Sequence, residues 1–420
     1  WATAHATYGR RPFAELLAPA IEYARDGFPV TARLAGWISQ AEDVLARAPE
    51  TAAMLLPEGR SPRAGQPLRF PDLARTLEAI QVAGRAGLYE GEVAKELARA
   101  SRVGGGLLDE ADLAATRAEW GAPLVGTYRG VRLYETPPPT QGFAALLLLA
   151  LLAEDDLPRL GYQSAASIHL LVEAKKLAFA DRNRYLTDPA FVPVPTARFL
   201  DPDYARQRRA LIDPARAQAW DTVPAGSLEG DTVSVAVVDA DDTAVSLIQS
   251  LYFGFGSGVV AGRTGVLLQN RGAYFTLDPR HPNRLEPGKQ PLHTLMPSLA
   301  FEGDRLRWLF GCMGADGQPQ IHAQVYSALI DFGLDLQQAI EAPRWLAGRF
   351  ALGDPREPLN VEARFSAATL AGLEARGHAV VRWPPWSELA GHAHGIEIEP
   401  GSATRMGAAD PRADGAAIGY

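Results

Sequence analysis

The sequence has little cysteine and no long apolar run. Cys312 is the only cysteine in 420 residues, which excludes an internal disulfide and a zinc site made of several thiolates. The longest apolar run, Phe143–Ala153, is about half as long as the roughly 20 residues of a membrane-spanning helix, and acidic residues follow it. We therefore expect a buried helix there and no membrane span.

Clusters of basic residues are equally scarce. The formal net charge is −8, and no run of lysines and arginines is long enough to form a binding stripe. Such a surface disfavours a phosphate backbone, so nucleic acid is not an expected partner. Hydrophobic residues make up 47% and charged residues 21% of the chain, which indicates a globular protein with a sizeable core. None of these absences fixes the cellular location, which stays open.

Helical spacing dominates the first 120 residues. Apolar residues recur at this spacing in Pro12–Gly27, which ends on a glycine. A second pattern, from residue 70 to 106, indicates two helices that are broken at Gly84–Gly87 and stopped at Gly104–Gly106. A strand pair is expected near residues 128–135, ahead of the Phe143 helix and of another helix that ends near residue 186.

From Thr232 onward, strands and glycines replace helices. Two further helices are expected, near residues 321–333 and 366–378, and the C-terminal tail is expected to end in a short strand. Helices first, a strand-rich body after them and no internal repeat predict an α/β sandwich with two sheet layers.

One predicted hairpin, residues 229–250, has two faces of different chemistry. Strict alternation predicts two strands, and "DADD" at 239–242 has the chemistry of a turn. With a three-residue loop at 240–242, Thr232 faces Ser250 across the strands, with Cβ atoms about 5 Å apart. One face is apolar (Val233, Val235, Val237, Val245, Leu247) and the other is small and hydroxyl-bearing.

Two alternatives stay open at this point. A two-residue loop would shift the register by one and turn Ser250 away from Thr232. Hairpins also carry serine and threonine on a solvated face without any chemical role, and the stretch by itself favours this interpretation.

Several ordered motifs together resemble the γ-glutamyltransferase family, also called glutathione hydrolases, and within it a divergent γ-glutamyltransferase-like branch. The resemblance covers nearly the whole chain. The motifs are "LLAPAIEYARDGFPV", "ETPPPTQG", "EAKKLAFADRNRYLTDP", "GDTVSVAVVD", "FGSGVVAGRTGVLLQNRG", "PGKQPLHTLMPSL", "GCMGADGQPQ", "EAPRW" and "DPRADGAAIGY".

The resemblance implies an α+β fold, the four-layer αββα sandwich of the N-terminal-nucleophile hydrolases. It also implies a precursor that cleaves itself, here at Asp231–Thr232. Residues 1–231 would be the large-subunit remnant and 232–420 the small catalytic subunit, together one αββα domain. Family members begin upstream of Trp1, so we expect an N-terminal segment to be missing. Many are periplasmic or secreted, and a cytoplasmic location of this branch is compatible with the single cysteine.

The chemistry explains why a threonine starts the hairpin. Cleavage would free the α-amine of Thr232, whose ordinary pKa of about 7.7–8 leaves part of it neutral and able to take the hydroxyl proton. Ser250 falls where the family has a hydroxyl residue that bonds to the catalytic threonine. Gly314 and Ala315 match the family's oxyanion glycines; since alanine replaces the second, we expect the hole to survive if its φ stays negative.

Substrate recognition departs most from the family pattern. At the aligned positions the chain has Tyr252, Arg271, Tyr274, His293 and Thr294, with no acidic group to hold an ammonium. The leading expectation is a γ-glutamyl hydrolase or transferase acting on γ-glutamyl amides such as glutathione, with an altered pocket. One alternative is a cephalosporin (glutaryl) acylase-type amidohydrolase, because this pocket suits a carboxylate-bearing acyl group without an α-amine. Another is an unprocessed, inactive binding scaffold.

No cofactor and no metal are expected. The expected partners are a small acyl-amide substrate and the chain's own two subunits. His392 and His394 in "GHAHG" are interpreted as ordinary strand histidines, because carboxylates are sparse around them. Cys312 is expected to be a buried small residue with no base beside it. "GFGSG" lacks the spacing of a dinucleotide site.

Overall fold

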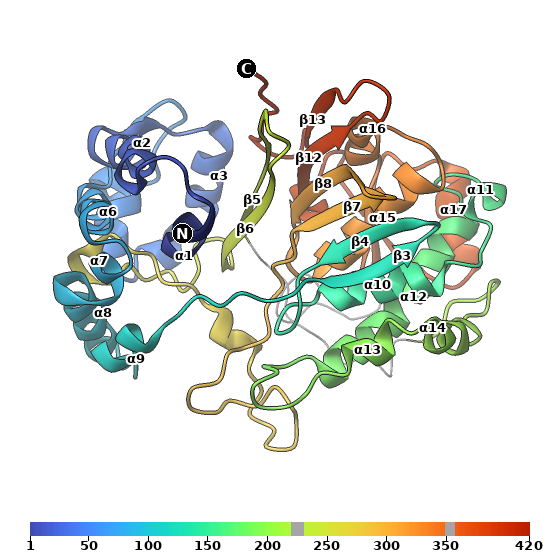
Figure 1. Ribbon diagram of the computed structural model, residues 1–420, viewed down its shortest axis with the longest axis horizontal. Coiled ribbons are helices and arrows are strands. Elements are labelled where there is room, and N and C mark those ends of the chain that lie inside the picture. The colour runs from blue at the N-terminus through green and yellow to red at the C-terminus, as the bar shows by residue number, and fades with distance from the viewer. Residues whose placement is uncertain (220–230, 349–357) are drawn as a thin grey trace. The chain divides into compact units, whose positions relative to one another are not determined.

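The computed structural model describes residues 1–219, 231–348 and 358–420, which form two compact units (Figure 1). Unit 1 is Trp1–Trp120 with Phe253–Asn270, and unit 2 is Gly121–Tyr252 with Arg271–Tyr420. The sequence analysis expected the whole chain to be one layered domain. The predicted subunit boundary at Asp231–Thr232 lies within unit 2. It is a predicted site of peptide-bond cleavage and not a boundary between the two compact units.

Unit 1 is mainly helical, as predicted. The first predicted helix is α2 (Phe13–Asp26), and the interrupted pattern forms α6 (Pro71–Ala83), α7 (Ala86–Tyr89) and α8 (Gly91–Val103). Gly84 ends α6 with φ of 58°, which a glycine adopts without strain. The remaining elements are α1 (Ala2–Tyr8), β1 (Phe28–Pro29), α3 (Ala32–Gln40), α4 (Glu42–Leu45), α5 (Pro49–Leu55), η1 (Pro57–Gly59), β2 (Pro67–Leu68), α9 (Glu110–Ala115) and η2 (Gly262–Thr264).

A six-stranded sheet forms the centre of unit 2, with strand order β13-β12-β8-β7-β4-β3 and antiparallel neighbours. Its strands are β3 (Leu124–Tyr128), β4 (Val131–Glu135), β7 (Ser298–Glu302), β8 (Arg305–Met313), β12 (His392–Ile398) and β13 (Arg405–Ala409). A smaller sheet consists of β9 (Trp345–Ala347), β10 (Pro358–Glu362) and β11 (Ala379–Trp383). The short strand expected in the tail is wrong, because no strand follows β13 in residues 410–420.

Helices cover the large sheet. The predicted Phe143 helix is α10 (Gly142–Leu151), which contacts β3 and β4, while α15 (Gln318–Ile330) contacts β8. Almost every side chain of α10 is buried, as expected for its apolar sequence. The other helical elements are α11 (Leu157–Leu160), α12 (Ala165–Tyr185), α13 (Thr196–Phe199), α14 (Pro202–Arg209), η3 (Arg271–Tyr274), η4 (Ala315–Gly317), α16 (Leu336–Glu341), α17 (Ala367–Ala375) and η5 (Glu388–Ala390). Among the described helices, none is long and apolar enough to cross a membrane.

The hairpin of β5 (Asp231–Val238) and β6 (Ala244–Tyr252) packs on β8 and β12 of the large sheet. A glycine permits this close packing: a Cβ atom on Gly311 would lie 2.2 Å from Oγ of Ser234. The valines of the outer face stay open, with Val233 55% and Val237 46% exposed. Unit 2 therefore shows a helical layer, the large sheet and the hairpin layer, and this outer face is not covered among its described residues.

A group of buried ion pairs joins the end of the chain to the smaller sheet; we call Arg344, Glu362, Asp410 and Arg412 the C-terminal cluster. Nη2 of Arg412 lies 2.5 Å from Glu362, and Nη2 of Arg344 lies 2.5 Å from Asp410. Arg412 also donates to Asp410 at 3.0 Å. All four side chains are at most 5% exposed, so two cations and two anions balance one another away from water.

Candidate active site

The register of the hairpin is the one predicted from a three-residue loop. Thr232 pairs with Ser250, Asp231 pairs with Tyr252, and the register shifts between Asp231 and Thr232. The Asp239 N–H donates to the carbonyl of Thr243 at 3.1 Å, which closes the loop. The alternative with a two-residue loop is therefore wrong.

The hydroxyl-bearing face of the hairpin points toward the large sheet. Thr232 is 8% exposed and Ser234 is 4% exposed, while Oγ of Ser246 donates to the carbonyl of Phe310 at 3.5 Å. The interpretation of this face as solvated is therefore wrong. The sheet buries the hydroxyls because small side chains fit against Gly311, whereas the larger valines would not.

Oγ1 of Thr232 is buried and has no hydrogen-bond partner within the described part of the chain. Oγ of Ser250 instead accepts the N–H of Tyr252 at 2.8 Å. The hydroxyl contact that the resemblance implies between Thr232 and Ser250 is thus not formed here, although the strand pairing places the two residues opposite each other. A buried hydroxyl without a partner costs about 1–3 kcal/mol and calls for a functional explanation.

The predicted oxyanion pair follows β8 directly. Gly314 has φ of 152° and Ala315 has φ of 44°, so the negative φ on which the expected survival of the oxyanion hole depended is not found. The first hydrogen bond within this turn runs from the Gly317 N–H to the Gly314 carbonyl at 2.6 Å. The N–H groups of Gly314 and Ala315 are therefore not donors in the turn's own hydrogen bonds. Because α15 begins at Gln318, the turn also lies at the positive end of a helix dipole.

The left-handed conformation of an alanine costs about 1–2 kcal/mol, because its Cβ approaches the carbonyl oxygen. A buried side chain holds this conformation: Nε2 of Gln141 donates to the carbonyl of Ala315 at 2.8 Å. The same amide nitrogen lies 3.3 Å from the carbonyl of Thr294, one of the predicted substrate residues.

Four of the predicted substrate residues lie together. The rings of Tyr252 and Tyr274 have centroids 4.5 Å apart, and the guanidinium carbon of Arg271 lies 5.6 Å from the Tyr252 ring. Burial, helped by the charge of Arg271, lowers the pKa of His293 to about 4. Burial also lowers the pKa of Arg271, although the two tyrosines oppose the shift. The structure thus gathers a buried cation and two tyrosines at the end of the strand that carries Ser250.

Sequence reasoning missed three buried residues behind this pocket: Gln141, Arg182 and Asp316. Nη1 of Arg182 donates to Oε1 of Gln141 at 2.6 Å and forms a salt bridge with Asp316. The hydroxyl of Tyr274 donates to Oδ2 of Asp316 at 3.3 Å. A signal was present, because the three residues stand in the family motifs "ETPPPTQG", "EAKKLAFADRNRYLTDP" and "GCMGADGQPQ".

Three histidines of the described chain, His169, His378 and His394, bond to protein groups. Nε2 of His394 bonds to the carbonyl of Ser234 on the hairpin. In the described residues, one group has the donor spacing of a metal site, namely His169, Glu173 and His378. His169 bonds to His378 at 2.8 Å, and the ammonium of Lys176 lies 2.7 Å from Glu173, where it supplies the positive charge. We therefore interpret this group as structural.

Cys312 is wholly buried, as predicted. His322 lies close enough for the thiol to raise its pKa, but among the described residues its Nε2 has no hydrogen-bond partner, and its Nδ1 bonds to Glu135 at 2.7 Å. His322 is also wholly buried. The arrangement lies inside the core, where no substrate reaches it.

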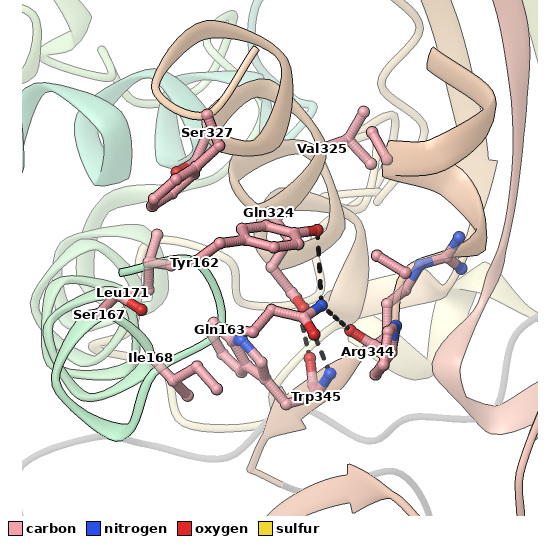
Figure 2. Close-up of a pocket in the computed structure, with 14 residues that line it drawn as sticks. Tyr162, Gln163, Ser167, Ile168, Leu171, Gln324, Val325, Ser327, Arg344 and Trp345 are labelled. Atoms are coloured by element: carbon pink, nitrogen blue, oxygen red, sulfur yellow. Dashed lines mark hydrogen bonds between the residues drawn. The ribbon is translucent and has the colours of Figure 1, made fainter. Parts of the chain in front are cut away.

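A separate cavity lies between α12 and α15 (Figure 2). Its volume is about 30 Å³, the space of about one water molecule. Gln163 donates to the carbonyl of Pro343 at 2.9 Å, and Gln324 donates to the carbonyl of Trp345 at 2.9 Å. None of the predicted site residues lines this cavity, and it is too small for a substrate.

Comparison with known proteins gives concordant results. The family model described as gamma-glutamyltranspeptidase matches residues 1–420. A glutathione hydrolase-like proenzyme of Bacillus subtilis is 41% identical over 100% of this chain and 79% of its own length. An oxamate amidohydrolase proenzyme of Klebsiella pneumoniae is 41% identical over 97% of this chain and 76% of its own.

A solved structure, the cephalosporin acylase from Bacillus halodurans, superimposes with a TM-score of 0.90 at 35% identity. The match covers 100% of this chain and 77% of that one. The predicted α+β fold of the N-terminal-nucleophile type is thereby confirmed.

Proposed function

The chain belongs to the γ-glutamyltranspeptidase family, and on this basis we propose that it is an amidohydrolase whose nucleophile is Thr232. The observation that carries the proposal is the buried Oγ1 of Thr232, which has no hydrogen-bond partner among the described residues and lies opposite Ser250 at the point where the strand register shifts. Relatives named as proenzymes support a maturation step before activity.

Maturation would be an intramolecular acyl transfer. The Thr232 hydroxyl attacks the carbonyl carbon of Asp231, the peptide C–N bond breaks, and the released nitrogen takes the hydroxyl proton. The resulting ester is opened by water, which leaves the Asp231 carboxylate and a free Thr232 with its own α-amine. That amine, with an ordinary pKa of about 7.7–8, serves as the general base in later turnovers.

Turnover follows the same chemistry on an external amide. The α-amine takes the Thr232 proton, the oxygen attacks the substrate carbonyl, and the N–H groups of Gly314 and Ala315 stabilise the negative oxygen. The condition of a negative φ at Ala315 is not met, but the residue keeps its N–H as a donor in the left-handed conformation. The proton passes to the departing amine, which leaves an acyl ester on Thr232. Water then hydrolyses the ester, or an acceptor amine takes the acyl group.

The pocket favours an acyl group with a carboxylate and no ammonium. Arg271 offers the positive charge, framed by Tyr252 and Tyr274. Asp316, the carboxylate that bonds to Tyr274, is already engaged by Arg182 and so is not available to an ammonium. Because charge-assisted bonds are about twice as strong as neutral ones, this difference discriminates between substrates. We therefore place glutaryl-like or oxamate-like amides first.

A γ-glutamyl hydrolase or transferase is the second candidate. The relative named glutathione hydrolase-like, 41% identical over the whole chain, supports it. An unprocessed binding scaffold is the third, and it requires that Thr232 stay in an uncut chain.

A comparison of three substrates separates these candidates. Purified, processed protein is assayed with a glutaryl anilide, the matching γ-glutamyl anilide and oxamate. The proposal expects the glutaryl anilide or oxamate to give the higher kcat/KM. A preference for the γ-glutamyl anilide would reverse the order of the first two candidates, and no turnover of all three would favour the scaffold.

Intact-mass measurement tests the nucleophile. Wild-type precursor is expected to yield two chains that meet at Asp231–Thr232, whereas Thr232→Ala should stay uncut and inactive. Thr232→Ser retains a hydroxyl and should still be cut. Ser250→Ala should slow turnover more than it lowers stability, since it loses one hydrogen bond worth roughly 1 kcal/mol. An uncut wild-type chain with full activity would refute the mechanism.

A further inference from the structure

Three buried side chains from separate elements meet behind the proposed active site; we call Gln141, Arg182 and Asp316 the site network. Gln141 precedes α10, Arg182 lies in α12, and Asp316 lies in η4. Their exposed fractions are between 0% and 3%. None of them was among the residues that the sequence suggested for catalysis or binding.

Each polar end of Gln141 has a definite partner. Its Oε1 accepts from Nη1 of Arg182, and its Nε2 donates to the carbonyls of Ala315 and Thr294. One side chain therefore joins the oxyanion turn to Thr294 of the proposed acyl pocket. By acyl pocket we mean the predicted substrate residues Tyr252, Arg271, Tyr274, His293 and Thr294. An amide flip would place Nε2 against a guanidinium and Oε1 against two carbonyls, so the bonding pattern fixes the orientation.

Asp316 forms a second connection between the same two regions. It directly follows Ala315, its Oδ1 is held by Arg182, and its Oδ2 accepts from the hydroxyl of Tyr274. Tyr274 in turn packs on Tyr252, which pairs with Asp231 across the hairpin. Arg182 is itself fixed, because Nε and Nη2 both donate to Oδ1 of Asn183 at 2.9 and 2.7 Å.

A buried ion pair is often only a structural element. Two features distinguish this one. Its bonds end on predicted site residues of both kinds, the oxyanion turn and the acyl pocket. It also holds the carbonyl of Ala315, an alanine in a left-handed conformation that the local sequence disfavours.

We propose that the site network positions the oxyanion turn at Gly314–Ala315 relative to the acyl pocket at Tyr274 and Thr294. The inference rests on the proposed function, since it assigns these groups their roles. Asp316, Arg182 and Gln141 are positioning residues that act through Tyr274 and Ala315. Catalysis by preorganised donors depends on such fixed distances, and a displacement of about 1 Å can cost about a hundredfold in rate.

Kinetics of a double-mutant cycle test the link through Tyr274. Asp316→Asn is expected to lower kcat and raise KM, and Tyr274→Phe is expected to raise KM while its ring stays in place. If the Tyr274 hydroxyl acts through Asp316, the double variant should be no worse than Asp316→Asn alone. If instead the hydroxyl contacts the substrate directly, the two effects should multiply, and that result would overturn the link.

A matched control is available in the same unit. Tyr326→Phe removes a buried tyrosine hydroxyl, which bonds to Oγ of Ser298 at 2.5 Å, on a residue outside the proposed site. It is expected to leave kcat and KM at wild-type values. An equal loss in Tyr326→Phe and Tyr274→Phe would indicate a general effect of cavity formation and would overturn the positioning role.

Hydrogen–deuterium exchange gives a readout that needs no substrate. The Gly317 N–H closes the turn on the Gly314 carbonyl, so its exchange reports whether the turn is held. In Asp316→Asn and in Gln141→Met the Gly317 amide should exchange about tenfold faster or more, because each variant loses a contact that holds the turn closed. In Tyr326→Phe its exchange rate should be unchanged. Unchanged exchange in both variants would overturn the inference even if the protein hydrolyses amides. If the variants exchange faster but the wild-type protein hydrolyses no amide, the proposed function is refuted. The role of the site network in holding the turn would then still stand.

Discussion

The C-terminal cluster and the site network are both made of buried charged and polar side chains, yet they end on different partners. Arg344 and Arg412 complete their bonding on backbone carbonyls, including those of Ile340, Ala342 and Gly391. Arg182 and Asp316 end instead on Gln141 and Tyr274, which lead to the proposed site. Similar chemistry therefore has different consequences in the two places.

The two groups should therefore respond differently to mutation, one in stability and the other in catalysis. The C-terminal cluster balances two cations and two anions around the start of β9, the end of β10 and the C-terminal tail, so its loss should be felt as global stability. The site network supports a turn with a strained alanine, so its loss should be felt in catalysis first. Burial and charge alone do not distinguish the two; the ends of the hydrogen-bond chains do.

The largest effect is expected from Arg412→Met. It leaves Glu362 and Asp410 with one cation fewer in a dry environment, and breaking a buried pair in this way costs about 3–5 kcal/mol. Denaturant unfolding should show this loss of the free energy of unfolding, while kcat and KM of the folded fraction stay unchanged. Arg364→Met is the control, because Arg364 pairs with the same Glu362 but is 19% exposed, and it should cost much less. Equal losses of the free energy of unfolding in the two variants, or an altered kcat, would contradict the assignment of the C-terminal cluster to global stability alone.

The second largest difference between the two regions is expected in the dependence of stability on acid pH. Burial and the charge of Arg271 lower the pKa of His293 to about 4, whereas an exposed histidine has a pKa of about 6.5. The unfolded chain therefore binds a proton that the folded protein excludes between these values. Stability from neutral His293 is present above pH 6.5 and lost as the pH falls toward 4, by at most about 1.4 kcal/mol per pH unit.

His293→Gln should flatten this part of the stability curve, measured by urea unfolding at intervals from pH 7 to pH 4. The C-terminal cluster should respond only at lower pH. Burial alone would raise the pKa of Asp410, but the charges of Arg344 and Arg412 outweigh it and lower that pKa below its ordinary value of 3.8. Burial also lowers the pKa of His169 and His378, so part of the slope should remain in the variant. A slope between pH 6.5 and 4 that is as steep in His293→Gln as in wild type would contradict the assignment.

The smallest effect is expected from Ala315→Gly. Glycine removes the left-handed strain of about 1–2 kcal/mol, but it also gains roughly 0.5–1 kcal/mol of freedom in the unfolded chain. The free energy of unfolding should therefore rise by about 0–1.5 kcal/mol, and kcat should stay within a factor of two because the N–H remains. Thermal unfolding and steady-state kinetics measure both. A clear loss of stability would mean that the alanine methyl group is needed for packing.

Local patterns predicted much of the fold. Helical spacing located α2, α6 and α8 because a buried stripe recurs every three to four residues, whereas α10 was located by its continuous apolar run, since it is buried on nearly every side. Turn chemistry at Asp239–Asp242 located the turn of the hairpin but left two loop lengths open, and only the structure selects the register that pairs Thr232 with Ser250. The tail strand failed for the same local reason, since an alternating apolar ending does not reveal whether a neighbouring strand is there to pair with it.

The site was only partly predictable. Motif matching named Tyr252, Arg271 and Tyr274, which the structure brings together. It did not reveal the bonds of Gln141, Arg182 and Asp316, because these are 41 to 175 positions apart in sequence and meet only after folding. The sign of φ at Ala315 also depends on Gln141, a long-range contact that no local rule contains.

The outward face of the hairpin bears on how the protein behaves at high concentration. Val233, Val235, Val245 and Leu247 present an open apolar strip, 40–55% exposed, and within the described residues β5 and β6 pair only with each other. Open strand edges beside apolar side chains are a common route to self-association. Light scattering should therefore increase with concentration and with sulfate, which strengthens apolar contacts, and less so in a variant with Val235→Thr and Val245→Thr. The two valines lie outside the proposed active site, so this variant would give a less adhesive protein for the kinetic measurements.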